Sequence, residues 1–377
     1  MTTKRSVERV TRFTRRAGVY ALLAIAFAVV SPGVQAQASI KVGEDVTIRF
    51  GTLLQGWGDW TQDPVSEGYS QNLYLRRARI LIGGQVAKNI TFFIETDNPN
   101  LGRAPKALGS GFILQDALAE VKLSDPLTIS AGLMFVPFCR NCIQSAATLL
   151  SLDYSSFSFL ATPATQSSVG RDIGFQAKGY FNGNRIEYRV GAFQGFRAAA
   201  LPGSPPARNP LRGVGRLQIN LFEPETPGIF YTGTYLGTKR VLAIGGGFDT
   251  QAGTGDNYKA WTIDAFLDHP LTDSVSLTAQ VDYFAYDGGQ TFALPEQTAI
   301  FAEAGVYFKP LRLMPFVKFE TQNFDAAAVG DIARYQAGLT YYISGHNANL
   351  KIAYSRFDPD VGNAANQFTT QLQVFYY

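Results

Sequence analysis

Three arginines fall within four residues of an apolar run, LYLRRARILIGG, at residues 73–84. Clustered guanidinium groups bind phosphate and carboxylate groups through paired N–H donors, so this stretch could hold an anion. A dry core would leave Arg76, Arg77 and Arg79 unpaired beside leucine and isoleucine, which is costly. The run therefore requires an element with one apolar face and one wet face.

Two cysteines, Cys139 and Cys142, enclose the short sequence CRNC. Cysteines at this spacing can form a redox dithiol, half of a metal site or a haem attachment. No histidine follows Cys142 and the chain has no second cysteine pair, so we expect no metal and no cofactor. In an oxidising compartment we expect a disulfide, whose small ring adds little to global stability.

Residues 1–36 have the pattern of a cleaved secretory signal peptide. Six basic residues precede the apolar run AGVYALLAIAFAVV at 17–30, and VQA at 34–36 forms a small-residue cleavage site. An uncleaved anchor helix is less favoured, because the apolar run is shorter than the ~20 residues that span a bilayer. The remaining chain has 27 basic and 29 acidic residues, a net charge of −2, so nothing in it indicates nucleic-acid binding.

The exported chain repeats one pattern, segments of roughly ten residues that alternate apolar with polar side chains. In VSLTAQVDYFA, for example, valine, leucine and alanine share one face, while serine, threonine, glutamine and aspartate share the other. About sixteen strands are expected on this basis. They lie near 45–58, 71–83, 90–97, 112–123, 127–136, 171–181, 185–193, 213–222, 241–249, 258–267, 275–285, 298–308, 313–324, 332–343, 349–357 and 368–376.

The connections between these segments alternate between short and long. Short links such as 87–89, 124–126 and 182–184 are followed by long ones rich in Gly, Pro, Ser or Asp. This is the topology of an outer-membrane barrel, with short periplasmic turns and long extracellular loops. The connection 223–240 does not fit, because it is long and yet should be periplasmic.

A membrane barrel explains the apolar faces better than a soluble sandwich does. They mix Ala, Gly, Val, Leu, Tyr and Phe, with aromatic residues at strand ends, as at Tyr341–Tyr342 and 375–377, which resemble the girdles of a lipid-facing band. Bilayer hydrocarbon tolerates no open sheet edge, so inserted strands must close into a ring. We predict an all-β fold, a transmembrane antiparallel β-barrel over 45–377, preceded by a short periplasmic segment at 37–44.

A membrane barrel explains where the three arginines of residues 73–84 can lie. Ile80 faces lipid, and Arg77 and Arg79, on the opposite parity, face a water-filled lumen. Arg76 shares the parity of Ile80, so we expect it at the outer membrane rim beside Tyr74, where its side chain could reach the headgroups. A local β-bulge would serve equally well.

The chain also resembles a known family, the phosphate-selective porins O and P of Gram-negative outer membranes. The resemblance rests on LYLRRARILIGGQV at 73–86, LTISAGLMFVPF at 127–138 and YYISGHNANLKIAY at 341–354, and it spans most of 40–377. It implies a sixteen-stranded barrel, usually a homotrimer in contact with lipopolysaccharide, whose third loop folds inward and narrows the pore. Selected members of the family pass phosphate or polyphosphate along basic residues.

Seven arginines are candidates for such an anion path. They are Arg49, Arg77, Arg79, Arg140, Arg171, Arg185 and Arg189. Parity places nearly equal numbers of basic and acidic residues in the lumen, and the long loop 137–170 contains Arg140 and Asp153 but no lysine. The alternative is therefore that these arginines are solvated wall charges, each paired with an acid.

An enzymatic barrel is not expected. Hydrolysis normally needs a base close to a serine, or a pair of aspartates. The two histidines, His269 and His346, fall in predicted periplasmic turns, and the glycines 245–247 lack the lysine of a phosphate-binding loop. Glycines in barrel strands more often mark close packing.

The sequence therefore predicts an outer-membrane porin that passes ions and small hydrophilic solutes by passive diffusion. One alternative is an anion- or phosphate-selective porin, and a second is a plugged structural or adhesive surface barrel. The expected partners are two further copies of the chain, outer-membrane lipid, and the barrel-assembly machinery, which recognises an aromatic end such as Tyr377. In the third loop, the disulfide would stiffen the base of the inserted segment.

Overall fold

The alternating segments form long antiparallel strands in the computed structural model, which describes residues 39–109, 111–199, 209–253, 255–289, 292–326 and 330–377. The strands are β1 (Ser39–Lys41), β2 (Thr47–Gln62), β3 (Tyr69–Ala87), β4 (Ile90–Asp97), β5 (Ile113–Ser124), β6 (Leu127–Phe135), β7 (Arg171–Phe181), β8 (Ile186–Phe193), β9 (Arg212–Asn220), β10 (Val241–Gln251), β11 (Tyr258–Pro270), β12 (Val275–Asp287), β13 (Gln297–Phe308), β14 (Leu313–Phe324), β15 (Ile332–Ser344), β16 (Ala348–Pro359) and β17 (Ala365–Tyr376). Three short helices, η1 (Asn141–Ile143), α2 (Ala161–Ala164) and η2 (Lys309–Leu311), complete the described elements. None of the described helices is long and apolar enough to span a membrane.

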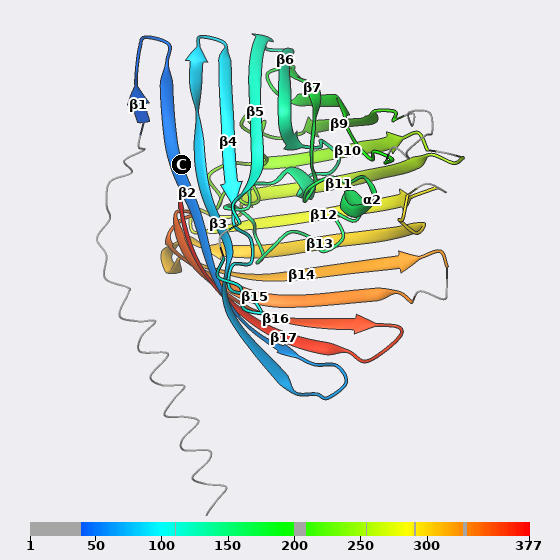
Figure 1. Cartoon of the computed structure of the whole chain (residues 1–377). Coiled ribbons are helices and arrows are strands. Elements are labelled where there is room, and N and C mark those ends of the chain that lie inside the picture. Colours follow the sequence, from blue (N-terminus) through cyan, green and yellow to red (C-terminus); the bar gives the residue numbers. More distant parts are fainter. Residues whose placement is uncertain (1–38, 110, 200–208, 254, 290–291, 327–329) are drawn as a thin grey trace, which may run out of the picture. The chain divides into compact units, whose positions relative to one another are not determined.

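The strands close into a ring. From β2 onward, each strand pairs antiparallel with the next, and β17 pairs back onto β2, with Gln367 opposite Thr61 (Figure 1). The strands β2–β17 therefore form a closed sixteen-stranded barrel, and the predicted fold class and strand number are confirmed. The three-residue β1 pairs with the beginning of β2, with Ser39 opposite Arg49.

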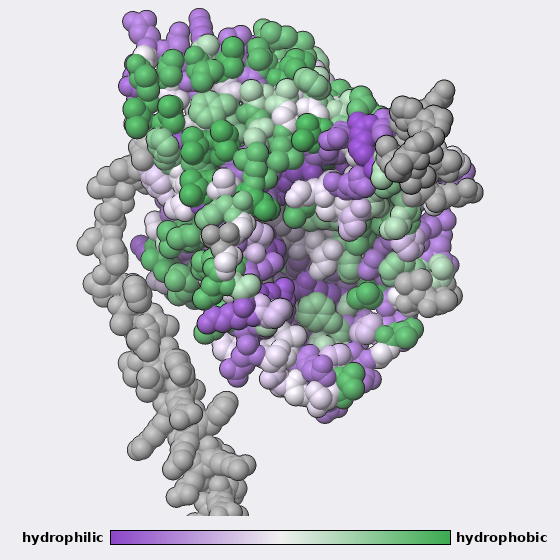
Figure 2. Space-filling view, in the orientation of Figure 1, coloured by the Kyte–Doolittle hydropathy of each residue, from purple (hydrophilic) through white to green (hydrophobic). Residues whose placement is uncertain are grey.

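The two faces of each strand differ as the alternation requires. In β12, Ser276, Thr278 and Asp282 are buried inside the barrel, whereas Val281 on the opposite face is 45% exposed. Large hydrophobic side chains are exposed on other outward faces in the same way, as Figure 2 shows for the strands at the upper left. In water this much exposed apolar surface would be unfavourable, so the outer face is suited to lipid.

The short turns lie at one end of the barrel, because two strands, one in each direction, separate each short turn from the next. The turn Asn182–Gly183–Asn184 joins β7 to β8 with φ angles of 50°, 62° and 66°. Asparagine and glycine tolerate this left-handed region better than other residues, which explains their use in so tight a link. The long connections, including 136–170, leave the opposite end of the wall.

The aromatic residues at two strand ends do not lie where the sequence predicted. Tyr342 and Tyr377 do not belong to an outer aromatic girdle: Tyr342 is buried in an interior cluster with Met314, and the Tyr377 ring packs against Phe93. The predicted signal peptide at 1–36 lies outside the described residues.

Candidate functional site

The arginines of β3 turn into the barrel because this strand carries a β-bulge. The pairing of β3 with β2 passes from Arg77 directly to Leu75, so Arg76 is the extra residue. A bulge of this kind brings two consecutive side chains to the same face. Arg76 therefore contacts Asp153 inside the barrel. Its expected position at the membrane rim is wrong, and the alternative, a local β-bulge, is the one that the structure contains.

Asp153 lies in the 136–170 connection and binds two arginines of the wall. Its carboxylate is 2.8 Å from Nη2 of Arg76 and 2.5 Å from Nη2 of Arg77. Burial would raise the pKa of the Asp153 carboxyl, but the two guanidinium groups hold it below its ordinary value. Asp153 is therefore charged and fixes this connection to β3.

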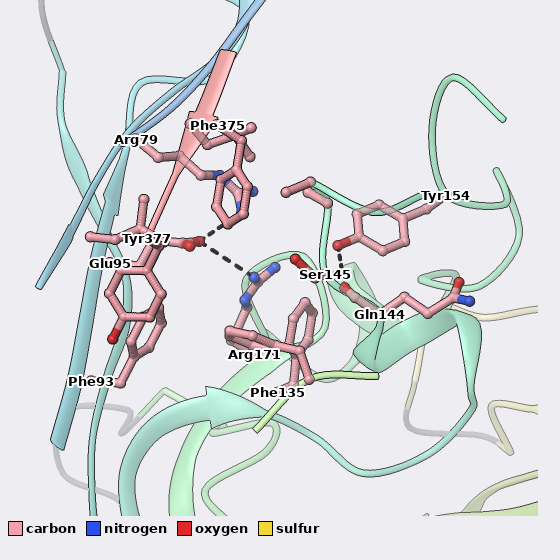
Figure 3. A pocket seen from close by; sticks show the side chains of 15 residues that line it. Arg79, Phe93, Glu95, Phe135, Gln144, Ser145, Tyr154, Arg171, Phe375 and Tyr377 are labelled. Carbon is pink, nitrogen blue, oxygen red and sulfur yellow. Dashed lines mark hydrogen bonds and ion pairs between the residues drawn. The ribbon is translucent and has the colours of Figure 1, made fainter. Parts of the chain in front are cut away.

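A second group of charges lies beside it, where Glu95 stands between Arg79 and Arg171 (Figure 3). Arg79 donates to Glu95 at 2.7 Å and to Asp97 at 2.9 Å. Arg171 is paired with Asp116 at 3.2 Å. The two guanidinium groups thus face three carboxylates, and this group of charges carries no net positive charge.

Arg140 lies in the turn closed by a disulfide between Cys139 and Cys142. Its guanidinium group binds Glu225 with both terminal nitrogens, at 2.6 and 2.8 Å. Burial would raise the pKa of Glu225, but Arg140 holds it below its ordinary value. The backbone N–H of Arg140 also donates to Asp264 on β11, so the turn is tied to the wall through its main chain.

The remaining candidates for the anion path lie apart from this group. Arg189 is buried and paired with Glu187 at 2.5 Å. Arg185 is exposed in a turn and donates to the carbonyl oxygen of Leu221, and Arg49 is exposed with its guanidinium group 5.6 Å from the Tyr377 ring. The structure therefore places five of the seven arginines inside the barrel, each beside an acid, and two at exposed positions.

This pairing is general within the part of the chain that the structure describes. Every buried arginine there contacts a carboxylate, including Arg212 and Arg216, which the proposed path had omitted and which bind Asp249 and Asp264. Lys351 differs, because its ammonium group donates to three backbone carbonyl oxygens of the 136–170 connection. In the same described ranges, no group of histidine, cysteine and acidic side chains is arranged to hold a metal ion.

The 136–170 connection contacts inward-facing side chains around most of the ring. Its hydrogen bonds reach Gln55 on β2, Glu303 on β13, Glu320 on β14, Lys351 on β16 and Gln373 on β17. On its apolar side, Leu150 and Leu152 pack against inward residues of β14, β15 and β16. The connection is therefore bonded to inward-facing side chains of strands on several sides of the ring.

The connection 223–240, whose length the sequence left unexplained, reaches the same region. Its Tyr231 forms a parallel bridge with Gln144 of the 136–170 connection and is 4% exposed. Its Glu225 binds Arg140, as described above. The two connections, which leave opposite ends of the wall, therefore meet inside the barrel, and this accounts for the extra length of 223–240.

The interior is more apolar than the alternation suggests. Phe284 on β12 and Phe301 on β13 face inward with no exposed surface and join a cluster that includes Phe138 and Ile143. A cavity of about 70 Å³ lies between the two connections and β2, β3 and β4 (Figure 3). Aromatic residues line much of it, and the Arg79–Glu95–Arg171 group forms its polar side.

Comparison with known proteins agrees with this architecture. Residues 50–203 match the family model of the phosphate-selective porins O and P. No curated protein matches the chain. The fold is similar to that of the outer-membrane channel DcaP of Acinetobacter baumannii, with 12% identity, a TM-score of 0.60, and 90% of this chain and 100% of that one covered.

Two further solved structures share the fold. An anion-selective porin from Comamonas acidovorans has 10% identity and a TM-score of 0.61, with 88% of this chain and 100% of that chain covered. OmpT of Vibrio cholerae, in its trimer form, has 10% identity and a TM-score of 0.55 over the same shares of the two chains. Residues 50–203 therefore match the phosphate-selective porins O and P, and the closed sixteen-stranded barrel has the fold of outer-membrane porins.

Proposed function

We propose that this porin conducts ions and small hydrophilic solutes by passive diffusion, with little preference for anions, and that it is a channel rather than an enzyme. The observation that carries the proposal is the pairing of each buried arginine in the described interior with a carboxylate. A channel attracts anions when its lining presents uncompensated positive charge. Here the guanidinium donors are already occupied by acids of the wall and of the two connections.

The contacts of the 136–170 connection restrict the solutes that can pass to small ones. The 136–170 connection is bonded to strands on several sides of the ring, and the cavity beside it measures about 70 Å³. A water molecule needs about 10–15 Å³ of such volume, so this cavity holds only a few waters. We assign the 136–170 connection as the size filter.

A second candidate function is an anion-selective porin. The Comamonas acidovorans porin with the same fold is anion-selective, and the family matched over 50–203 is described as phosphate-selective. In this chain that activity would require some of the acids, Glu95 or Glu225 for example, to release their arginines. Assembly into a homotrimer is supported by the trimer form of the structurally similar OmpT.

Single-channel recording in planar bilayers tests the proposal. We expect ohmic current steps, a reversal potential close to zero under a KCl gradient, and no block by millimolar phosphate. Anion-selective current that low phosphate blocks would favour the second candidate, and the absence of current from every preparation would favour a plugged surface barrel. Chemical cross-linking of the purified protein in detergent tests the trimer, which a monomer-only pattern would contradict.

A further inference from the structure

We infer that the connection 223–240 is a plug, inserted from the end of the barrel that carries the short turns, and that it must leave its seat against the 136–170 connection for solutes to pass. The inference rests on the proposed channel function and adds a gating element to it. Other connections at that end are short, such as 182–185 between β7 and β8. A turn as short as 182–185 would be enough to join β9 to β10, so most residues of 223–240 are not needed for the connection and can enter the barrel.

The seat against the 136–170 connection is made by main-chain hydrogen bonds. Tyr231 donates from its backbone N–H to the carbonyl oxygen of Ile143 at 2.9 Å, and its own carbonyl accepts from Ser145 at 2.9 Å. One residue pair further on, the backbone N–H of Gly233 donates to Oγ1 of Thr148. The two connections therefore form one parallel β-bridge inside the barrel, which the hydrogen bond from Gly233 extends.

Charged side chains hold the plug around this bridge. Glu225 binds Arg140 of the 136–170 connection with both carboxylate oxygens. The Tyr231 ring lies 4.9, 5.0 and 5.4 Å from the guanidinium carbons of Arg140, Arg189 and Arg216, which is within the range of cation–π attraction. Arg189 also donates to the carbonyl oxygens of residues 228 and 229.

The other half of the plug is held by a single acid of the wall. Asp268 on β11 accepts hydrogen bonds from the Thr234 hydroxyl and from the backbone N–H groups of Tyr235 and Gly237. A ring nitrogen of His346, in the turn between β15 and β16, donates to the carbonyl oxygen of Thr234. These polar contacts converge on two groups, and Tyr235 and Leu236 add packing against interior apolar side chains.

The 136–170 connection is held much more firmly, which is why we assign movement to 223–240. It carries the Cys139–Cys142 disulfide and supplies much of the interior apolar cluster, including Phe138, Ile143 and Phe157. From the 223–240 connection, Tyr231 is the one described residue fully within that cluster, with Ile229 and Phe230 packed at its edge. The segment with less buried apolar surface is the one expected to open first.

Gly233 offers a direct test, because it lies where the two connections touch. A Cβ atom at this position would lie 2.4 Å from the carbonyl oxygen of Thr148 and 2.9 Å from the Cα of Leu149. Both are main-chain atoms, so a larger residue must push the connections apart. Gly228 provides the matched control, because a Cβ there would approach no atom closer than 3.6 Å and valine keeps the main-chain carbonyl that accepts from Arg189.

The experiment records single channels from the full-length mature protein and from the Gly233→Val and Gly228→Val variants, each first shown to be folded by its heat-sensitive migration in gel electrophoresis. We expect Gly233→Val to raise the ratio of open to closed time by roughly tenfold, which corresponds to losing a few main-chain contacts. Gly228→Val should match the wild type. Equal currents from all three proteins would overturn the plug, whereas no current from any of them would overturn the channel function itself.

Glu225→Gln keeps the test decisive if Gly233→Val does not fold. The amide preserves the shape of the side chain but removes its charge, so the bond to Arg140 weakens while the packing remains. We expect longer openings than in the wild type. A folded Glu225→Gln variant with wild-type open and closed times would contradict the plug even without data from the glycine variant.

Discussion

Arg76 and Arg77, consecutive residues of β3, bind the two carboxylate oxygens of one acid, Asp153, at 2.8 and 2.5 Å. Consecutive residues of a regular strand point to opposite faces, so this relationship exists only because of the bulge at Arg76. It connects the arginine-rich wall to the 136–170 connection through one side chain. The charge balance of the interior therefore depends strongly on Asp153.

Replacing Asp153 by asparagine should make the channel more selective for anions. The change leaves Arg76 and Arg77 without their carboxylate, so the interior gains positive charge next to the size filter. Loss of one partner from a buried ion pair typically costs about 3–5 kcal/mol, so some loss of thermal stability should accompany it. The reversal potential under a KCl gradient measures the effect.

Asp125→Asn is the control for that measurement. Asp125 is exposed in the turn between β5 and β6 and pairs with the exposed Lys122. Its substitution changes the net charge of the protein by the same amount without touching the interior. Equal shifts of reversal potential in the two variants would mean that Asp153 has no special position along the permeation path.

Channel opening should increase as the pH falls from about 6.5 towards 4. Burial lowers the pKa of His346 to about 4, opposed by the hydrogen bond to Thr234, and the nearby Lys351 lowers it further. The Tyr342 ring is the other titratable group in contact with it. Because the pKa is below its usual value while the plug is seated, the seated state is favoured above pH 6.5 and loses that advantage as the pH falls through 4.

The pH dependence is measured as the ratio of open to closed time between pH 7 and pH 4. His346→Gln can still donate a hydrogen bond to Thr234 but does not titrate, so its profile should be flatter than that of the wild type. His269, in β11, remains in both proteins and serves as an internal control. Identical profiles for the two proteins would assign the acid response to groups other than His346.

The disulfide should contribute little to the stability of the whole barrel. It joins Cys139 and Cys142, which are three positions apart, and closing so small a ring removes little conformational entropy from the unfolded chain. We expect Cys139→Ser/Cys142→Ser to keep nearly the wild-type apparent unfolding temperature in detergent. A large decrease would show that the turn around Arg140 depends on the crosslink for its shape.

The barrel itself could be predicted because its determinants are local. Alternation in a segment such as 275–285 is a property of consecutive residues, and each strand pairs with its neighbour in the sequence. Short links such as Asn182–Gly183–Asn184 can also be recognised by their residue types. Strand number, orientation and closure therefore followed from the chain alone.

The interior could not be predicted in the same way, because it depends on contacts between distant segments. Nothing in the sequence around Glu225 indicates that it binds Arg140, which is 85 positions away. Phe284 has the parity of the polar face of its strand, and nothing near it in the sequence indicates that its apolar partner is Phe138 of the 136–170 connection. One signal was available: a 223–240 connection too long for its place in the topology.

The apolar side of the 136–170 connection leads to a last prediction, that Leu150→Ala destabilises the protein while Val317→Ala does not. Leu150 has no exposed surface and packs with Met314, Phe316 and Tyr342 inside the barrel. Truncating a buried leucine typically costs about 2–5 kcal/mol, because a cavity remains. Val317 lies on the outer face with 57% of its surface exposed, where detergent or lipid fills the space of the lost methyl groups.

Thermal unfolding in detergent should show a lower apparent midpoint for Leu150→Ala alone, and its channels should fluctuate more, because the size filter has lost one of its anchors. Equal midpoints for the two variants would mean that the connection is held by its ion pairs and hydrogen bonds and that the interior apolar cluster contributes little.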